Sequence, residues 1–308
     1  MVRILITDPI SEKGLKLLEE AGIKYDYCPG ISQNDLLNII KDYDALVVRG
    51  RTKVTKEVIE RGRRLKVIAR VGVGLDNIDV DTAKAKGISV INAGPATADS
   101  VAELTIGLMI ALSRRILFGD ESLRRGFWAK NYCMGAELRG KTLGIIGVGN
   151  IGSRVARIAN ALGMNVLGYD KFPEKAKEML KLVGGSAKFV TMDDLLRESD
   201  IISIHVPLLP ETRGMISWEE VKKMKEGVLL INTARMELFD PDPIIWGLES
   251  GKIAGLAADT NLKPDNPFVR KLLGFPNVIL TPHIGAQTYE AQERAAEVVI
   301  KRIIELLK

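Results

Sequence analysis

The sequence predicts an α/β protein made of two doubly wound parallel-sheet domains. Along most of the 308 residues, short runs rich in valine and isoleucine alternate with segments of helical periodicity. Strands that alternate with helices in this way form parallel sheets with helices packed on both faces. A polar, turn-rich stretch at Asn92–Asp99 interrupts the alternation, and a second series of strands follows it. The chain is therefore expected to form two such units.

The first unit is expected to contain strands separated by short helices. The clearest helical patterns are Glu12–Ala21 and Gln33–Lys41. Ser11 and Ser32 precede them as N-caps, because a serine hydroxyl accepts hydrogen bonds from the first free N–H groups of a helix. The predicted strands are Val2–Thr7, Lys24–Cys28, Ala45–Val48, Val67–Val71 and Ser89–Asn92.

A long helix that runs to about Arg115 is expected to open the second unit. Ser100 and Glu103 have the Ser-x-x-Glu spacing of a capping box, which favours a helix start at Ser100. Its apolar window, Val101–Leu112, is too short for a membrane span of about twenty residues. Six strands follow, the number in a complete nucleotide-binding sheet. They are Leu143–Gly147, Asn165–Tyr169, Ile201–His205, Val228–Asn232, Ile253–Ala258 and Val278–Leu280.

The last segment, Tyr289–Leu307, is predicted to be a helix, because its apolar residues recur at helical spacing. We expect this helix to close the first unit. The second domain, residues 98–285, is then inserted into a first domain that consists of residues 1–97 and 286–308.

The composition excludes several classes of protein. With only Cys28 and Cys133, the chain supports neither a disulfide framework nor a zinc-finger array, and a reducing compartment, the cytoplasm, is expected. The formal charge of +5 comes from basic residues interleaved with acidic ones, which is typical of a solvated surface. The segment Met1–Asp8 lacks the apolar run of a signal peptide. We therefore expect no nucleic acid, no membrane and no metal as a partner.

The first motif with chemical meaning is Gly147-x-Gly149-x-x-Gly152, which follows a predicted strand and opens a helical pattern at Ile151–Leu162. Such glycines permit a tight turn, close approach to a pyrophosphate and close helix–strand packing, and the helix N-terminus attracts the phosphates. Asp170, eighteen residues after Gly152, is placed to accept hydrogen bonds from ribose hydroxyls and to repel a 2′-phosphate. These features predict a Rossmann domain that binds NAD.

Two alternatives to NAD binding stay open from these residues. Lys171 lies beside Asp170 and weakens the case against NADP. A Rossmann sheet can also exist without any bound dinucleotide.

Four polar residues fall at the ends of predicted strands in the second unit, namely His205, Arg235, Asp259 and His283. Ligands of doubly wound sheets bind at the carboxyl ends of the strands, so we expect these side chains at one site. Each of them alone is compatible with a structural role. Together, beside a dinucleotide motif, they indicate catalysis.

The chain resembles the D-isomer-specific 2-hydroxyacid dehydrogenases, most closely the short archaeal-type D-3-phosphoglycerate dehydrogenases. The resemblance implies a Rossmann NAD domain inserted in a flavodoxin-like substrate domain. It also implies a homodimer formed through the cofactor domain, with the Val101–Arg115 helix as a candidate element of the interface. The stretches that carry it are Val47–Val54, Ala69–Asp79, Ser100–Glu103, Gly140–Gly147, His205–Pro207, Asn232–Arg235 and Thr281–Ala286.

The resemblance implies two catalytic residues. His283 is the general acid/base that protonates the carbonyl oxygen of the substrate, and Arg235 clamps the substrate carboxylate with its planar fork of donors. Asp259 is implied to face the nicotinamide carboxamide. The residues implied to contact the cofactor are Gly147, Gly149, Asn150, Ile151, Gly152, Asp170, His205, Val206, Pro207, Thr212, Thr233, Ala234, Asp259 and Gly285.

The first domain is implied to hold the substrate. The backbone N–H groups of Val73 and Gly74 are implied to bind its carboxylate. Arg49 and Arg51, with Lys53, are candidates for a substrate phosphate, and the alternative is that they are ordinary surface charges.

Some positions depart from the family pattern. The glutamate that hydrogen-bonds the catalytic histidine is expected where this chain has Pro264, and Asp265 beside it is the candidate substitute. Met236 replaces the usual glycine after the arginine. The bulky segment Met236–Trp246 indicates an altered wall of the pocket.

Two functions from different classes follow from these residues. The first is an NAD-dependent dehydrogenase of D-2-hydroxy acids, with D-3-phosphoglycerate, the substrate of serine biosynthesis, as the leading candidate. Reduction of hydroxypyruvate or glyoxylate is its neighbouring alternative, because Gly50 replaces a serine in the phosphate loop. The second is a low-activity NAD-binding regulatory protein, which Pro264 favours.

Overall fold

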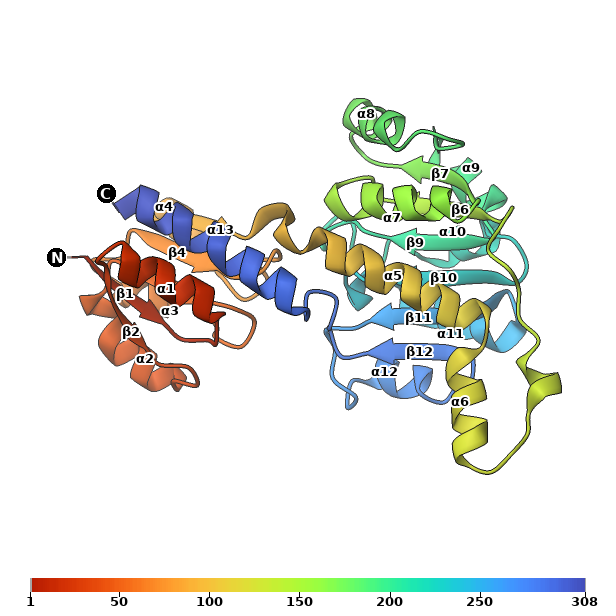
Figure 1. The fold of residues 1–308 in the computed structure, drawn as a ribbon, viewed down its shortest axis with the longest axis horizontal. Coiled ribbons are helices and arrows are strands. Elements are labelled where there is room, and N and C mark those ends of the chain that lie inside the picture. Colours follow the sequence, from red (N-terminus) through yellow and green to blue (C-terminus); the bar gives the residue numbers. More distant parts are fainter. Residues whose placement is uncertain (1, 308) are drawn as a thin grey trace. The chain divides into compact units, whose positions relative to one another are not determined.

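Two α/β units make up the chain in the computed structural model, which describes residues 2–307 (Figure 1). The chain passes from the first unit to the second after Thr97 and returns after Gly285. Each unit has its own parallel sheet and its own buried core. The predicted fold class is confirmed.

The first unit contains a five-stranded parallel sheet in the order β2-β1-β3-β4-β5, which is the flavodoxin-like order. Each strand lies within one residue of its predicted bounds. The strands are β1 (Arg3–Ile6), β2 (Lys24–Tyr27), β3 (Ala45–Val48), β4 (Val67–Arg70) and β5 (Ser89–Asn92). The helices are α1 (Glu12–Glu20), α2 (Gln33–Ile39), α3 (Lys56–Arg61), α4 (Val80–Ala85) and α13 (Tyr289–Leu307).

Side-chain alternation along the strands gives this sheet two apolar faces. Ile4 and Ile6 of β1 pack in the cluster that contains the buried residues of α1 and α13, whereas Leu5 packs in the cluster that contains those of α2 and α3. Close contact of α1 with α13 depends on Gly14, because a Cβ there would lie 3.0 Å from the Cβ of Ala296. The C-terminal helix is therefore an integral part of the first core.

The second unit contains a seven-stranded parallel sheet in the order β12-β11-β10-β9-β6-β7-β8. Six of these strands were predicted, and the seventh, β8 (Lys188–Phe189), has only two residues and no readable hydrophobic period. It occupies the third position of the Rossmann strand order, and β12 extends the opposite edge. The others are β6 (Thr142–Ile146), β7 (Asn165–Tyr169), β9 (Ile201–Ile204), β10 (Val228–Asn232), β11 (Ile253–Asp259) and β12 (Val278–Thr281).

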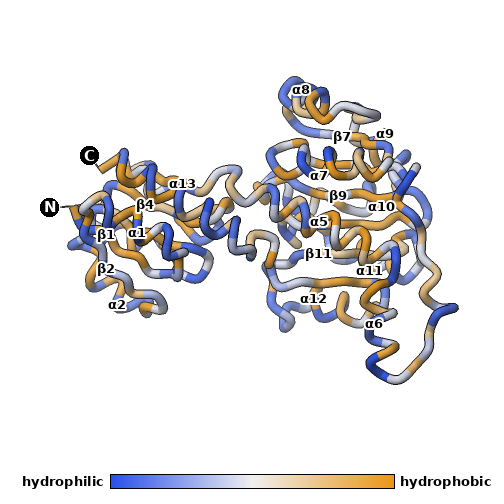
Figure 2. Tube along the Cα trace, in the orientation of Figure 1, coloured by the Kyte–Doolittle hydropathy of each residue, from blue (hydrophilic) through white to orange (hydrophobic). Residues whose placement is uncertain are grey.

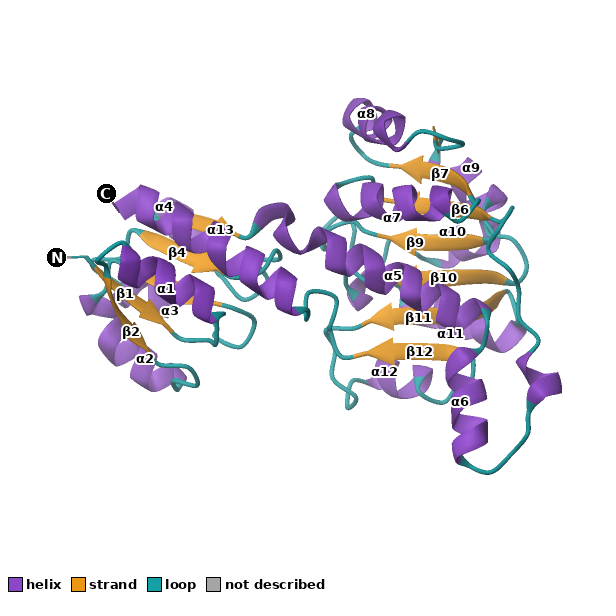
Figure 3. Ribbon diagram, in the orientation of Figure 1, coloured by secondary structure: helices purple, strands orange, loops and turns teal. Residues whose placement is uncertain are grey.

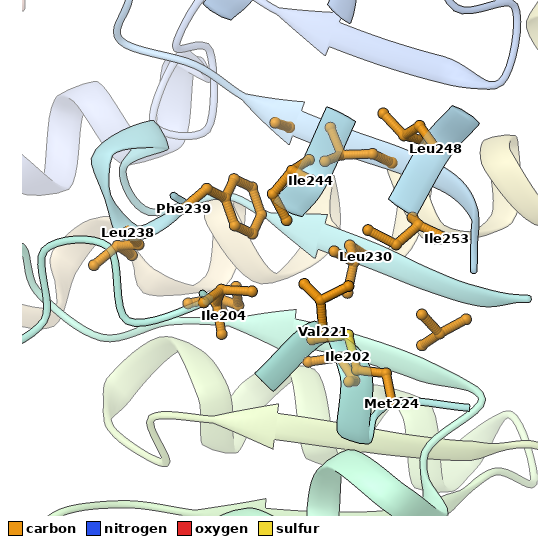
Figure 4. Close-up of a cluster of buried hydrophobic side chains, with 14 of the residues drawn as sticks. Ile202, Ile204, Val221, Met224, Leu230, Leu238, Phe239, Ile244, Leu248 and Ile253 are labelled. Carbon is orange, nitrogen blue, oxygen red and sulfur yellow. The ribbon is translucent and has the colours of Figure 1, made fainter. Parts of the chain in front are cut away.

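Helices cover both faces of this second sheet (Figure 3). Hydrophobic residues are concentrated along its strands (Figure 2), and those of α10 and α11 interlock with Ile202, Ile204 and Leu230 of the strands (Figure 4). The helices are α5 (Ala98–Ser113), α6 (Ile116–Arg124), α7 (Asn150–Ala161), α8 (Pro173–Val183), α9 (Met192–Glu198), α10 (Trp218–Lys223), α11 (Pro241–Ser250) and α12 (Pro267–Leu272).

One predicted helix start is wrong, and one predicted N-cap makes no capping hydrogen bond. The helix does not begin at Ser100, because the 3₁₀ turn Gly94–Thr97 leads directly into α5, which begins at Ala98. Ser32 does cap α2 by accepting a hydrogen bond from the N–H of Asp35, at 3.1 Å. Ser11 occupies the corresponding position before α1, but its hydroxyl makes no capping hydrogen bond.

The apolar helix of the second unit is longer than the window predicted from the sequence. The segment Gly94–Ser113 has 20 residues and a mean hydropathy of 1.3, so by length and composition alone it could cross a membrane. However, 61% of it is buried inside the protein, where α5 packs against α7, β10 and β11. Burial of this kind is what the core helix of an α/β sheet requires.

Residues 116–134, which contain α6, form an arm of the second unit that follows α5. It begins at Arg115, which has a left-handed φ of 52°, and returns at Gly135. Its base is closed by a hydrogen bond of 2.9 Å from the N–H of Ala136 to the carbonyl of Ser113. A Cβ at Gly135 would lie within 2.4 Å of that same carbonyl oxygen, so only glycine fits.

Candidate active site

The parallel order of the second sheet brings the predicted site residues to one edge. Because the carboxyl ends of adjacent parallel strands meet, residues far apart in sequence follow one another along this edge. From β12 to β7, the residues at or just after the strand ends are His283, Asp259, Arg235, His205, Gly147 and Asp170.

The glycine-rich turn after β6 has the shape that a dinucleotide needs. Gly147 has a φ of +97°, and a Cβ there would lie 2.8 Å from the backbone of His205. A Cβ at Gly152 would lie 2.1 Å from the carbonyl oxygen of Gly147. A Cβ at Gly149 would meet no atom within 4 Å, so this glycine faces open space. Two glycines therefore allow tight packing, and the third leaves room for a pyrophosphate to approach the backbone.

The N-terminus of α7 faces this turn. Gly149 is its N-cap and supplies no side-chain hydrogen bond to the first N–H groups, which are thus available to an anion. Arg154 holds the helix start in place by donating to the carbonyl of Asn150, at 2.7 Å, and to Asp99 of α5, at 2.6 Å. The residues present fit a dinucleotide phosphate.

Asp170 is held rigidly at the end of β7. One of its carboxylate oxygens accepts a hydrogen bond from the N–H of Val148, at 2.9 Å, and the other accepts one from the N–H of Phe172, also at 2.9 Å. The side chain therefore ties the glycine-rich turn to the neighbouring strand. Each oxygen keeps a second lone pair for a ribose hydroxyl.

Asp259 is built into the turn that carries His283. Its carboxylate, on a residue only 3% exposed, accepts hydrogen bonds from the Thr281 hydroxyl at 2.6 Å and the N–H groups of Ile284 at 2.8 Å and Gly285 at 2.7 Å. Gly285 permits this approach, because a Cβ there would lie 3.1 Å from an Asp259 oxygen. The sequence indicated that Asp259 lies in the site but not that it braces this turn.

His283 itself has an unusual backbone. Its φ is +56°, in the left-handed region that is rare for residues other than glycine, and its N–H donates to the carbonyl of Thr281 at 3.0 Å. Its side chain is exposed. Such a conformation costs of order 1–3 kcal/mol and persists only where the surroundings enforce it. The three hydrogen bonds to Asp259 provide that enforcement.

The environment of His205, the other histidine, keeps its ring uncharged. Burial lowers its pKa to about 3, so the ring is neutral at physiological pH. Its Nε2 lies 2.8 Å from the Ser203 hydroxyl, and its buried Nδ1 has no hydrogen-bond partner among residues 2–307. A histidine that stays neutral cannot exchange a proton near pH 7, so this ring is unsuited to acid/base chemistry.

The turn after β10 is held by its own side chains. Asn232 donates to the carbonyl of Arg235 at 2.8 Å and accepts from the N–H of Ala234 at 2.9 Å. The Thr233 hydroxyl lies 2.9 Å from that of Thr105 in α5. The half-buried Arg235 donates to the carbonyl of Ala234, at 2.9 Å. The backbone around the predicted clamp is therefore fixed before any ligand binds.

The loop after β9 is similarly ordered. The Thr212 hydroxyl donates to the carbonyl of Pro207 at 2.7 Å and accepts from the N–H of Leu209 at 2.8 Å. Val206 packs partly buried against the core cluster below.

The segments that depart from the family pattern lie in two different environments. Pro264 and Asp265 are exposed in the turn between β11 and α12. Met236 is only 1% exposed and joins Leu238, Phe239 and Ile244 in the core cluster shown in Figure 4. Many of the apolar side chains of the segment after Arg235 therefore fill the interior, and an altered pocket wall stays a prediction.

In the first unit, the candidate phosphate residues follow β3. Asp8, which the sequence analysis missed, is 1% exposed and accepts hydrogen bonds from the N–H of Arg49 at 2.6 Å and the Thr52 hydroxyl at 2.7 Å. Arg51 pairs with Asp8 at 3.2 Å and also donates to the carbonyls of Thr7 and Ile31. The only sequence signal for this role of Asp8 in organising the basic loop is its position just past the end of β1.

The side chain of Arg49 is engaged as well. It donates to the carbonyl of Pro9 at 3.3 Å and to Gln287 at 3.2 Å, and burial lowers its pKa. Lys53 on the same loop is exposed. Beyond β4, Val73 is exposed and its carbonyl accepts a hydrogen bond of 2.6 Å from Asn92, while Gly74 is half-buried.

Comparison with known proteins supports a dinucleotide-binding role for the second unit. Residues 106–285 match the family model of the D-isomer specific 2-hydroxyacid dehydrogenase NAD binding domain. The chain is 45% identical over 309 residues to a D-3-phosphoglycerate dehydrogenase of Methanocaldococcus jannaschii and covers 58% of that protein. It is 44% identical over 310 residues to a hydroxypyruvate reductase of Thermotoga maritima, with 99% of this chain and 98% of that protein covered.

A solved structure agrees with these relatives. The glyoxylate reductase of Paecilomyes thermophila superposes with a TM-score of 0.86 and 31% identity, over 98% of this chain and 94% of that one. The matched family model is that of an NAD-binding domain, and the glycine-rich turn and Asp170 have the geometry such a domain requires. The cofactor is therefore NAD, and the chain belongs to the family of D-isomer-specific 2-hydroxyacid dehydrogenases.

Proposed function

We propose that the protein catalyses the NAD-dependent interconversion of D-3-phosphoglycerate and 3-phosphohydroxypyruvate, as in serine biosynthesis. The observation that carries an enzymatic role is the braced turn of His283 on the same sheet edge as the glycine-rich cradle. The basic loop Arg49–Lys53, organised by Asp8, favours a phosphorylated substrate. The relative in Methanocaldococcus bears the corresponding name.

The chemistry expected of the chain is proton transfer and charge recognition. Bound NAD supplies the hydride acceptor, and its reduced form the donor. The His283 imidazole takes the proton of the substrate hydroxyl in oxidation and returns it to the carbonyl oxygen in reduction. Arg235 binds the substrate carboxylate with paired N–H donors. The N–H groups of Val73 and Gly74, in the first unit, are proposed as substrate-binding groups of that unit.

The pairing of Arg51 favours a second candidate substrate, hydroxypyruvate. The guanidinium of Arg51 is already paired with Asp8 and with backbone carbonyls, so little of its charge is left for a phosphate. Gly50 adds no hydroxyl to the loop. The Thermotoga relative carries the name of a hydroxypyruvate reductase.

NADH oxidation with 3-phosphohydroxypyruvate, hydroxypyruvate and glyoxylate separates these substrates. We expect the phosphorylated acid to have a kcat/KM at least about tenfold higher, because a charge-assisted contact is worth about 1.5–3 kcal/mol. In the Arg49→Ala variant, that advantage should shrink while the reduction of hydroxypyruvate changes little. A wild-type preference for hydroxypyruvate assigns the reductase function instead.

The same assay tests the low-activity alternative. If NAD raises the melting temperature of the protein but none of the keto acids is reduced, the protein is an NAD-binding regulator. A wild-type protein that neither binds NAD nor reduces any of these keto acids would contradict both functions.

We also propose that two copies of the chain associate through the arm. Large apolar side chains are exposed along residues 116–134, among them Phe127, Trp128, Tyr132 and Met134, which are 67%, 81%, 71% and 82% exposed. A surface this apolar is typical of a protein–protein interface, and aromatic residues are enriched there. The proposed occupant is a second copy, as the family resemblance implies.

Light scattering of the full chain measures the association directly. We expect a dimer for the wild type and a monomer after Trp128→Glu combined with Tyr132→Glu, because buried unpaired charges oppose association. Tyr289→Glu is the matched control, since Tyr289 is 89% exposed and lies outside the arm. A monomeric wild type would contradict the proposal.

We further place the protein in the cytoplasm. Both cysteines, Cys28 and Cys133, are free thiols in the structure. Free thiols are typical of proteins in a reducing compartment.

A further inference from the structure

The ribose end of the cofactor site carries a charged pair that the sequence analysis did not use. Lys171 directly follows Asp170 at the end of β7, and its Nζ lies 3.2 Å from an oxygen of Glu211 in the loop after β9. Both side chains are well exposed, at 70% and 51%. Two carboxylates and one ammonium group therefore follow β7 and β9, the two strands that flank β6 in the sheet.

The three side chains differ in how firmly they are held. Asp170 is fixed by hydrogen bonds from the N–H groups of Val148 and Phe172. Glu211 precedes Thr212, whose hydroxyl is anchored to the backbone of its own turn. A hydrogen bond from its own backbone N–H and one from Lys171 lower the pKa of Glu211, so it is ionised at neutral pH. Lys171, a long exposed side chain, is the mobile member of the group.

These positions give each charge a distinct effect on a ribose substituent. A 2′-phosphate is an anion that seeks a cation such as a lysine ammonium group. Asp170 repels it, and Glu211 pairs with Lys171, a cation that could offset this repulsion. A 2′-hydroxyl is uncharged and is insensitive to the same arrangement.

We propose that Glu211 is a second determinant of the preference for NAD over NADP, acting by holding Lys171 away from the ribose substituent. The proposal rests on the cofactor assignment made above and adds to it a residue that does not itself need to touch the dinucleotide. Without Glu211, Lys171 is free to pair with a 2′-phosphate beside Asp170. A simpler role, a surface ion pair that only stabilises the loops, predicts no effect on cofactor choice.

Calorimetric titration of the purified full chain with NAD and with NADP tests the proposal without any turnover. In Glu211→Gln, we expect NADP to bind about three- to fivefold more tightly, which is the upper range for one exposed ion pair. The affinity for NAD should stay within about twofold, since the 2′-hydroxyl is neutral. The gain should fade at about 1 M salt, where the Debye length is only about 3 Å.

Three further variants identify the residue responsible. Glu174→Gln removes the same charge from α8, where Glu174 pairs with Lys177 at 3.0 Å and is 84% exposed, so it controls for net charge. Lys171→Ala in the Glu211→Gln background should abolish the gain in NADP affinity. Asp170→Asn combined with Glu211→Gln should increase NADP affinity more than either change alone.

Three results would overturn the inference. They are a Glu211→Gln protein with unchanged NADP affinity, a gain equal to that of Glu174→Gln, and a gain that survives the loss of Lys171. Wild-type protein that binds neither nucleotide would instead contradict the cofactor assignment, so the two failures are distinguishable.

Discussion

Replacing His283 by asparagine is expected to lower kcat by about 10²–10⁴-fold, which is the usual contribution of a positioned general acid/base. Asparagine suits this test because it tolerates left-handed backbone angles better than most residues, and His283 has a φ of +56°. The turn braced by Asp259 should therefore survive the change. Single-turnover oxidation of NADH measures the loss, and calorimetry should show NAD binding unchanged.

The pH profile of the wild type provides an independent check of this assignment. Burial lowers the pKa of His205 to about 3, so that ring cannot account for a rate change between about pH 5 and 9. A titration of kcat in this range that disappears in His283→Asn supports the assignment. Retention of more than about a tenth of kcat in the variant would exclude His283 as the acid/base.

Gly152→Ala is expected to remove NAD binding and to destabilise the second unit. The added Cβ would lie 2.1 Å from the carbonyl oxygen of Gly147 and 3.1 Å from the Ile145 side chain. Because the first of these atoms is backbone, the turn and α7 must move apart, at a cost of about 1–3 kcal/mol. Denaturant unfolding measures the stability, and titration should show NAD affinity lowered by more than about tenfold.

Gly149→Ala is the matched comparison on the same turn. Its Cβ would meet no protein atom within 4 Å, and the φ of Gly149 is −91°, so the fold should be unaffected. NAD affinity should still fall, because the methyl group occupies the space left for the pyrophosphate. Wild-type stability and affinity in Gly152→Ala would show that the turn does not bind the cofactor as described.

Most of the fold could be predicted because strong local patterns coincide with tertiary burial. Strands β3, β5, β7 and β10 have their predicted bounds. Of these, β3, β7 and β10 are short apolar runs that are mostly buried in the sheet. The two-residue β8 could not be predicted, because pairing with β7 defines it and no periodicity does. The start of α5 was misplaced for a related reason, since a preceding 3₁₀ turn displaced the local capping signal at Ser100.

The candidate site could be predicted in its membership but not in its internal contacts. His205 and His283 look equivalent in the sequence, each after an apolar strand, yet one is half-buried and neutral and the other is exposed on a left-handed turn. Asp259 was expected to face the cofactor, and the structure shows its carboxylate holding the turn of His283. Asp8 was not identified, because its partners lie more than forty positions away in the chain.

The sequence by itself determined the two parallel-sheet units, the glycine-rich turn and the set of polar residues at the strand ends. These features depend on hydrophobic period and on glycine spacing, which are local properties of the chain. Only the tertiary structure decided which carboxylates are engaged, that the His205 ring is neutral, and that Lys171 pairs with Glu211. Burial and hydrogen bonding depend on residues that are distant in sequence, and these interactions set the charge and orientation of each side chain.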